Sequence, residues 1–424
     1  MTTASPDALL VTIGDELLNG QVLDGNARTV GRVLHTLGIP LVERRTVGDD
    51  PHRMRLTLED AAARHALVIV SGGLGPTPDD HTRAVMASLA GVPLLESAVV
   101  RARIEALARR RGRPLTAESA RQAWLPQGIE TLHNPVGLAP GLWLPLGPSI
   151  VCALPGVPGE LEAMLEQEVV PRLVAWPGRV ELESHTLRTM GVPESELARV
   201  LAGVDLGGVT IAYLPGAGGV DLRLDARGSG ARRRCAAAAA AVRSMLTETL
   251  GPVNYATGAR RLAAVVLDGL RARGWRLALA ESCSGGLIAS LLTDEPGSSD
   301  VLDASVVTYS NAAKCELLGV PAELVETHGA VSDEVTAAMA VGARRRLGAD
   351  VGLAVSGIAG PGGGTPEKPV GRVHIAVDGP AGAAGRRLDL GGTRDMVRRR
   401  AANLALDLLR RYAEGQVDPG ARRG

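Results

Sequence analysis

Residues 66–80 read ALVIVSGGLGPTPDD, and this stretch decides the fold class. Its first five residues form a continuous apolar run, which is typical of a strand buried on both faces of a parallel sheet. A glycine-rich loop follows, and the acidic pair Asp79 and Asp80 then opens a predicted helix that extends to Leu89. A strand, a loop and a helix in this order form the unit from which parallel sheets covered by helices are built.

The same alternation extends to both sides of this stretch. A buried strand is expected at residues 8–13, a second strand at 41–47, and strand segments around Leu142 and at 150–154. Helical spacing of apolar residues predicts helices at 30–37, 52–64, 99–110, 117–124 and 159–173. We therefore expect an α/β domain with a parallel sheet over residues 1–176.

Two further regions follow this domain. Residues 179–255 are expected to form a small α+β module, with strands at 182–188, 209–214 and 220–226, a helix at 194–201 and a closing alanine-rich helix. Residues 258–415 return to α/β alternation, with strands at 276–280, 301–309, 351–355 and 373–377 and helices at 260–273, 312–318, 333–347 and 395–412. Residues 416–424 are expected to be a mobile tail.

Composition excludes several classes of protein. Lys and Arg total 46 and Asp and Glu total 46, so the formal charge is zero and no overall field attracts nucleic acid or an acidic membrane. Phe is absent, with 4 Trp and 4 Tyr, which leaves few platforms on which bases could stack. The four cysteines form no C-x-x-C pair, and no apolar run is long enough for a bilayer. We expect a cytoplasmic protein that binds neither membranes nor nucleic acid directly.

Three loops in the first domain follow predicted strands, at residues 14–20, 71–80 and 154–160. Loops at the carboxyl ends of parallel strands share one edge of the sheet, so all three can meet one ligand. Helix caps and turns are the commoner explanation for one such loop, but three aligned loops favour a site. The expected nucleotide-binding residues are Gly14, Asp15, Glu16, Gly72, Gly73, Gly75, Thr77, Gly156 and Gly159, with Asp79 and Asp80 as candidate ligands of a divalent cation.

In the third region, residues 280–286 read AESCSGG and join a strand to a helix. A hydroxyl at this turn, with helix N–H groups nearby, suits a nucleophile beside an oxyanion hole, although a helix cap is the commoner role of such a serine. The next strand ends near Tyr309, and Lys314 follows on its helix, so chemistry between Ser282 and a lysine is possible. Lysine acts as a base only when its surroundings lower its pKa.

Two more features belong to this region. The loop at residues 356–371 is rich in glycine and could cradle a phosphate, or it could be a flexible hairpin connection; Arg394 then opens the last helix. Four arginine triplets, of which one is residues 398–400, lie on predicted helices, and such runs are more often solvated faces than basic patches.

At these motifs the sequence resembles the competence/damage-inducible CinA family across nearly its whole length. The resemblance implies a molybdopterin-binding-like first domain associated with metal-dependent ADP-ribose pyrophosphatase activity, and a KH-type middle module. It also implies a third domain with nicotinamide-nucleotide amidohydrolase activity, acting on nicotinamide mononucleotide (NMN) in pyridine nucleotide recycling without a cofactor. A homodimer is expected. An adaptor in competence or the DNA-damage response, with a first domain that binds a nucleotide or pterin without turnover, is the alternative.

The resemblance also implies roles for single residues. Ser282 is the expected nucleophile, Lys314 its proton-transfer partner, and Tyr309 a hydrogen-bonding group of the same pocket, while Cys283 stays open as a rival nucleophile. Backbone N–H groups near Ser284 and Gly285 are expected to stabilise the oxyanion. The remaining expected substrate-binding residues are Gly286, Ser356, Gly357, Lys368 and Arg394; Ser356 stands where relatives often have Thr.

Overall fold

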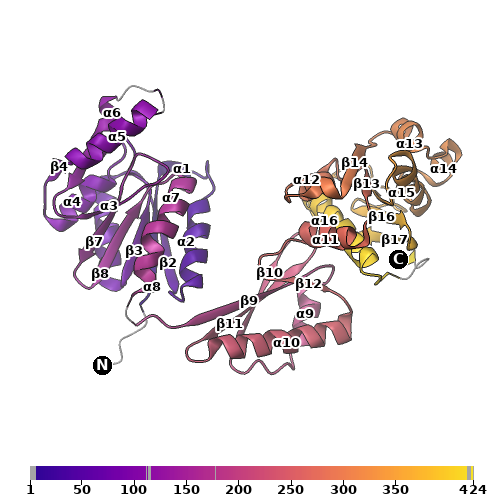
Figure 1. The fold of residues 1–424 in the computed structure, drawn as a ribbon, viewed down its shortest axis with the longest axis horizontal. Helices are drawn as coiled ribbons and strands as arrows, with labels where there is room; N and C mark the ends of the chain where they lie inside the picture. Colours follow the sequence, from indigo (N-terminus) through magenta and orange to yellow (C-terminus); the bar gives the residue numbers. More distant parts are fainter. Residues whose placement is uncertain (1–5, 111, 113–115, 177, 418–421, 424) are drawn as a thin grey trace. The chain divides into compact units, whose positions relative to one another are not determined.

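The structure is a computed structural model that describes residues 6–110, 112, 116–176, 178–417 and 422–423. Most of the predicted mobile tail, residues 418–421 and 424, lies outside these described residues. The chain forms two compact units, one of residues 1–183 with 227–231 and one of residues 184–226 with 232–424 (Figure 1). Among the described residues, no helix combines the length and apolarity needed to cross a membrane.

The first unit contains a six-stranded sheet in the order β2-β1-β3-β8-β7-β6. Its strands are β1 (Ala8–Ile13), β2 (Leu41–Val47), β3 (Leu67–Ser71), β6 (Glu130–Leu132), β7 (Gly141–Leu146) and β8 (Ser149–Leu154). The expected parallel pairing joins β2, β1, β3 and β8, whereas β7 is antiparallel to β8 and β6 to β7. Only two residues connect β7 to β8, and so short a link permits a hairpin but no parallel crossover.

Helices cover both faces of this sheet. Alternate residues of β1 enter two separate cores, Leu9 and Val11 on one face and Ala8 and Leu10 on the other. The helical elements of the unit are α1 (Asp15–Leu18), α2 (Gly25–Thr36), α3 (Pro51–Arg64), α4 (Thr82–Ala90), α5 (Ala98–Arg110), α6 (Ala117–Ala120), η1 (Arg121–Ala123), α7 (Pro158–Met164), η2 (Leu165–Val169) and α8 (Val170–Val174). Helices α3, α4 and α5 pack in the first core, and α2 and α7 pack in the second. This arrangement leaves the loops after the strands free to form a site.

Two predicted helices of this unit differ in extent. The helix expected from Asp80 begins at Thr82, because the Asp80 side chain binds the preceding loop instead of the helix. The helix expected at 117–124 is one short turn, α6, followed by a 3-10 turn; the chain then extends from Trp124 into β5 (Trp124–Pro126), which pairs with β4 (Leu94–Glu96).

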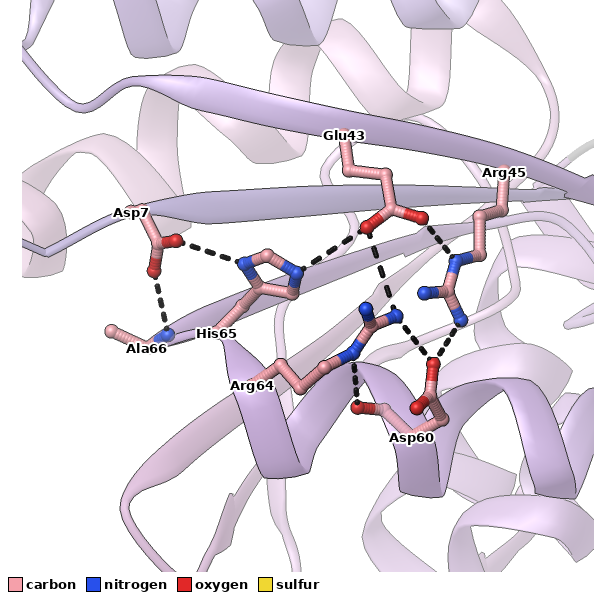
Figure 2. Close-up of polar contacts among 7 residues, drawn as sticks. All are labelled: Asp7, Glu43, Arg45, Asp60, Arg64, His65 and Ala66. Atoms are coloured by element: carbon pink, nitrogen blue, oxygen red, sulfur yellow. Dashed lines mark hydrogen bonds and ion pairs between the residues drawn. The ribbon is translucent and has the colours of Figure 1, made fainter.

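A charged cluster lies beside the starts of β1 and β3. Figure 2 shows its members, which are Asp7, Glu43, Arg45, Asp60, Arg64 and His65. Nδ1 of the buried His65 ring lies 2.9 Å from Asp7 Oδ2, and Nε2 lies 3.6 Å from Glu43 Oε2. The cluster ties β2 to α3 at the end of the strands opposite to the glycine-rich loops, so we assign it a structural role.

The second unit begins with an antiparallel sheet in the order β10-β11-β9-β12. The elements are β9 (Leu182–Thr189), α9 (Glu194–Leu201), β10 (Thr210–Pro215), β11 (Val220–Arg227), α10 (Ala231–Leu250) and β12 (Asn254–Thr257). This is the α+β module expected from the sequence, with β12 as an additional edge strand. Met190, which follows β9, packs in the core of the C-terminal sheet, so the module shares a compact unit with that region.

The C-terminal sheet has the order β14-β13-β15-β16-β17-β18. Its strands are β13 (Leu277–Glu281), β14 (Leu302–Val307), β15 (Val351–Gly357), β16 (Arg372–Gly379), β17 (Gly382–Asp389) and β18 (Arg422–Arg423). The helical elements are α11 (Leu262–Arg273), α12 (Leu287–Thr293), η3 (Ser298–Asp300), α13 (Asn311–Leu318), α14 (Ala322–His328), α15 (Asp333–Arg346) and α16 (Arg394–Ala413). Because β13 is parallel to both β14 and β15, the carboxyl ends of these three strands meet at one edge.

Candidate functional site

The Ser282 turn lies at that edge of the C-terminal sheet. The backbone N–H of Ser282 donates to Val355 O of β15 at 3.0 Å, and the N–H of Thr308, after β14, donates to Glu281 O at 2.8 Å. Ser282 is therefore hydrogen-bonded to β15 on one side, and Glu281 is hydrogen-bonded on the other side to Thr308, the residue after β14. Ser282 is 9% exposed, which leaves its hydroxyl in a largely desolvated position.

Lys314 of α13 points at this hydroxyl. Ser310 caps the helix by accepting from Ala313 N at 3.1 Å, and this places Lys314 in the first turn. Lys314 is only 1% exposed; its Nζ lies 3.3 Å from Ser282 Oγ and donates to Thr308 O at 2.8 Å. Burial lowers the pKa of Lys314, because the ammonium group loses its hydration, an effect that Cys283 and Cys315 oppose in part. A buried amine of this kind can accept a proton from a neighbouring hydroxyl.

Cys283 is less suited to be the nucleophile. Its thiol is buried, and burial raises its pKa to about 11. The thiolate is the reactive form of cysteine, so a raised pKa disfavours attack by this residue at neutral pH.

The turn after Ser282 is fixed by its own hydrogen bonds. Gly285 and Gly286 have φ of 63° and 89°, in the left-handed region that favours glycine. The Gly285 N–H donates to Ser282 O at 3.1 Å, and the buried Glu281 carboxylate accepts from Gly286 N at 3.0 Å. Glu281 also accepts from the N–H groups of Ile288 and Ala289 at 3.2 and 2.9 Å, which satisfies the start of α12.

These hydrogen bonds reduce the number of backbone N–H groups that can stabilise an oxyanion at this turn. The N–H groups of Gly285 and Gly286 are both used within the turn, so these glycines shape the loop instead of binding an oxyanion. The N–H of Ser284 has no hydrogen-bond partner among the described residues, and the buried Ser284 hydroxyl is likewise unpartnered there. Ser284 is therefore the backbone donor that we retain from the sequence-based expectation.

Tyr309 and Arg394 lie together near this turn. Arg394 Nη2 donates to the Tyr309 hydroxyl at 2.8 Å, and Nη1 donates to Gly360 O at 2.7 Å. Tyr309 is 63% exposed, which places this pair at the surface, unlike Ser282 and Lys314. The two residues offer a phenol and a cation to a ligand that enters from solvent.

The other expected substrate-binding residues have contacts within the protein. Ser356 is buried and its hydroxyl donates to Ala330 O at 2.7 Å, while Lys368 Nζ donates to His328 O at 2.6 Å. Gly357 pairs with Val373 in the sheet. These contacts hold the loop after β15 against neighbouring segments. In this conformation the three residues therefore stabilise that loop through contacts within the protein.

Two contacts of the Ser282 turn were missed at the sequence level. Glu281 was quoted only as part of the motif, and Arg398 was interpreted as one member of a solvated arginine triplet. Arg398 Nη2 in fact donates to Ser284 O at 2.8 Å. Its spacing of four residues from Arg394 places both on the same face of α16, and this was the signal that could have identified it.

The loops of the first unit line a cavity of about 450 Å³. Residues from all three expected loops contribute, namely Gly14, Glu16, Gly72, Gly73, Gly75, Asp79, Asp80 and Gly156, and Asp49 and Glu160 add two further carboxylates. Asp15, Thr77 and Gly159 do not line it. Among the described lining residues five are acidic and none is Lys or Arg, so a phosphate group there would meet backbone N–H groups instead of cationic side chains.

Asp80, a candidate metal ligand, is held within its own loop in this structure. Its Oδ1 accepts from Gly75 N at 2.8 Å, and its Oδ2 accepts from the N–H and hydroxyl of Thr77 at 2.8 and 2.6 Å. Both oxygens therefore brace the 75–80 loop. Asp79 is exposed, and hydrogen bonding by Thr77 lowers its pKa. No group of three or more His, Cys, Asp or Glu that could hold a metal ion occurs in the described part of the chain.

Comparison with known proteins covers almost the whole chain. Residues 9–175 match a probable molybdopterin binding domain, residues 184–256 the damage-inducible protein CinA KH domain, and residues 259–413 the CinA C-terminal domain. A CinA-like protein of Synechococcus sp. (strain RCC307) is 45% identical over 97% of this chain and 99% of its own length. A putative competence-damage inducible protein of Symbiobacterium thermophilum is 45% identical over 97% of this chain and 100% of its own.

Solved structures are similar to parts of this chain. The competence/damage inducible protein CihA from Agrobacterium tumefaciens is 43% identical, covers 35% of this chain and 91% of its own, and has a TM-score of 0.34. The relatives that match over nearly their full length decide the classification. The chain belongs to the CinA family, with a molybdopterin-binding-like domain, a CinA KH domain and a CinA C-terminal domain in that order.

Proposed function

We propose that the C-terminal site hydrolyses the carboxamide of NMN, releasing ammonia and nicotinate mononucleotide. The observation that carries this proposal is the 3.3 Å contact between Ser282 Oγ and the buried Lys314 Nζ. A serine paired with a desolvated lysine is an arrangement for acyl transfer, because the neutral amine can take up and return one proton. The family resemblance supplies the identity of the amide.

The reaction would proceed through an acyl-enzyme. Neutral Lys314 accepts the hydroxyl proton as Ser282 Oγ bonds to the carboxamide carbon, and the Ser284 N–H stabilises the oxyanion. The Lys314 ammonium then donates its proton to the leaving nitrogen, the C–N bond breaks and ammonia departs. Water attacks the resulting ester with Lys314 as base, nicotinate mononucleotide forms, and the proton returns to Ser282 Oγ. Neither step requires a metal ion or an oxidant.

Recognition of the nucleotide would fall to the surface pair. Arg394 carries a cation that suits the NMN phosphate, and its bond to Gly360 O leaves the guanidinium fixed beside the glycine-rich loop. Tyr309 would contribute its hydroxyl to the same ligand. An Arg394→Ala variant should therefore raise KM more than it lowers kcat.

The test is the incubation of purified protein with NMN, with ammonia and nicotinate mononucleotide both measured. Wild-type protein should release them in equal amounts, and Lys314→Ala should be nearly inactive. Addition of a metal chelator should leave this activity unchanged. Ammonia release that needs a divalent ion, or that persists in folded Lys314→Ala, would contradict the proposal.

We further propose that the cavity of the first unit binds a nucleotide containing a pyrophosphate, with ADP-ribose as the probe. The supporting observation is the convergence of the three loops on about 450 Å³. Because both Asp80 oxygens accept hydrogen bonds within the loop, we assign no hydrolytic step to this carboxylate. Metal-dependent cleavage is the activity that the family resemblance implies, and ADP-ribose incubated with and without Mg²⁺ tests it. Cleavage with Mg²⁺ supports turnover, and binding without cleavage supports a sensing domain. If the protein neither cleaves nor binds ADP-ribose, both alternatives are contradicted.

A further inference from the structure

Arg398 reaches from the last helix to the peptide that follows Ser284. The guanidinium is half-buried, and its Nη2 donates to Ser284 O at 2.8 Å. The same nitrogen would stand 3.3 Å from a Cβ added at Gly285, so no side chain fits comfortably between the guanidinium and the turn. The contact joins residues that are 114 positions apart in the sequence.

This contact fixes a peptide plane at both of its ends. The plane between Ser284 and Gly285 carries one carbonyl, which accepts from Arg398, and one N–H, which donates to Ser282 O. Glu281 holds the next residues of the turn through Gly286, so the chain on the carboxyl side of Ser284 has little freedom to rotate. The Ser284 N–H belongs to the preceding peptide plane, which meets this one at the Ser284 Cα, so holding the second plane limits the directions that the N–H can take.

We propose that Arg398 is a positioning residue for amide hydrolysis, which acts by orienting the Ser284 N–H toward the oxyanion. This inference rests on the proposed deamidase function. Arg398 bonds the Ser284 carbonyl and not the Ser282 hydroxyl, so its effect passes through that carbonyl.

The arginine triplet offers matched controls. Arg399 is 59% exposed in its side chain and pairs with Asp395 one turn earlier, at 2.7 Å. It carries the same charge on the same helix but has no hydrogen bond to the Ser282 turn within the described part of the chain. Arg399→Ala should therefore keep wild-type kinetics, which isolates the effect of the contact from that of net charge.

The experiment compares NMN hydrolysis by wild-type, Arg398→Ala, Arg398→Lys and Arg399→Ala proteins. Loss of one oxyanion-hole donor lowers kcat about 100-fold or more, so misdirection of a donor should lower kcat by at least about tenfold. We expect that loss in Arg398→Ala, with KM within about twofold of wild type, and a smaller loss in Arg398→Lys, because lysine restores the charge and one donor.

A binding measurement separates positioning from general damage. In the Ser282→Ala background, adding Arg398→Ala should leave the Kd for NMN unchanged, since the ground state does not use the oxyanion donor. A wild-type kcat in Arg398→Ala, or a kcat loss matched by an equal loss of NMN binding, would overturn the inference. Wild-type protein that releases no ammonia would instead overturn the proposed function itself.

Discussion

Replacement of Lys314 by methionine tests the proposed base while keeping the buried stem of the side chain. The change removes the amine at 3.3 Å from Ser282 Oγ and leaves Thr308 O without its 2.8 Å donor. General base catalysis contributes about 10²- to 10⁴-fold, so kcat should fall by at least about 100-fold. The lost hydrogen bond costs about 1–3 kcal/mol, and removal of a desolvated amine offsets part of that cost. The protein should therefore stay folded.

The pH dependence of stability gives an independent reading of the same side chain. Burial places the pKa of Lys314 below 10.5 in the folded protein, so between the folded pKa and 10.5 the unfolded chain binds more protons. The unfolding free energy of wild-type protein should rise with pH across this window, and Lys314→Met should lack that rise. Denaturant unfolding at several pH values measures it.

Three outcomes would refute this reasoning about Lys314. They are a kcat within tenfold of wild type in folded Lys314→Met, a pH profile of stability that does not differ between the two proteins, and a double variant with Ser282→Ala that loses far more activity than either single variant. Residues that act as one catalytic unit show non-additive losses, so the double variant should be little worse than Ser282→Ala alone.

Three further predictions follow from other contacts. Cys283→Ala should keep kcat within about twofold and thiol alkylation should be slow at pH 7, because the thiol pKa is about 11; rapid inactivation by alkylation would contradict this. Asp80→Ala should destabilise the first unit by about 2 kcal/mol and weaken ADP-ribose binding while deamidation stays intact; tight binding with unchanged stability would exclude the bracing role. A fragment of residues 184–424 should unfold at a higher temperature than residues 258–424, because Pro252 O accepts from the buried Arg410; equal melting temperatures would disprove that support.

The strands that sequence reasoning located correctly are those with a strong local signal. The strands predicted at 8–13 and 41–47 coincide with β1 and β2, and the first of them is a nearly continuous apolar run, which is a distinctive pattern. The strand β17, Gly382–Asp389, was missed, since its sequence GAAGRRLD is rich in small and charged residues and depends on pairing with β16. Helix α14 was missed as well.

Some contacts of the candidate site could likewise be predicted from the sequence, and others depend on the folded structure. The pairing of Ser282 with Lys314 was accessible from sequence, because parallel strands bring their carboxyl ends to one edge and each residue follows such an end. For Arg398, the spacing from Arg394 predicts a shared face of α16, but the bond to the turn also depends on which face of that helix the sheet covers. Likewise, a carboxylate such as Asp80 can bind a cation or a backbone N–H, and only the folded loop distinguishes the two.

The central claim is that Ser282 is the nucleophile of an amide hydrolysis, and single-turnover ammonia release from NMN tests it most directly. Wild-type protein and Ser282→Ala are mixed with NMN at saturating concentration, and binding is confirmed in both by the Kd. The account predicts one ammonia per wild-type active site in the first turnover, and none from Ser282→Ala despite unchanged binding. Ammonia release by Ser282→Ala at the wild-type rate would contradict it.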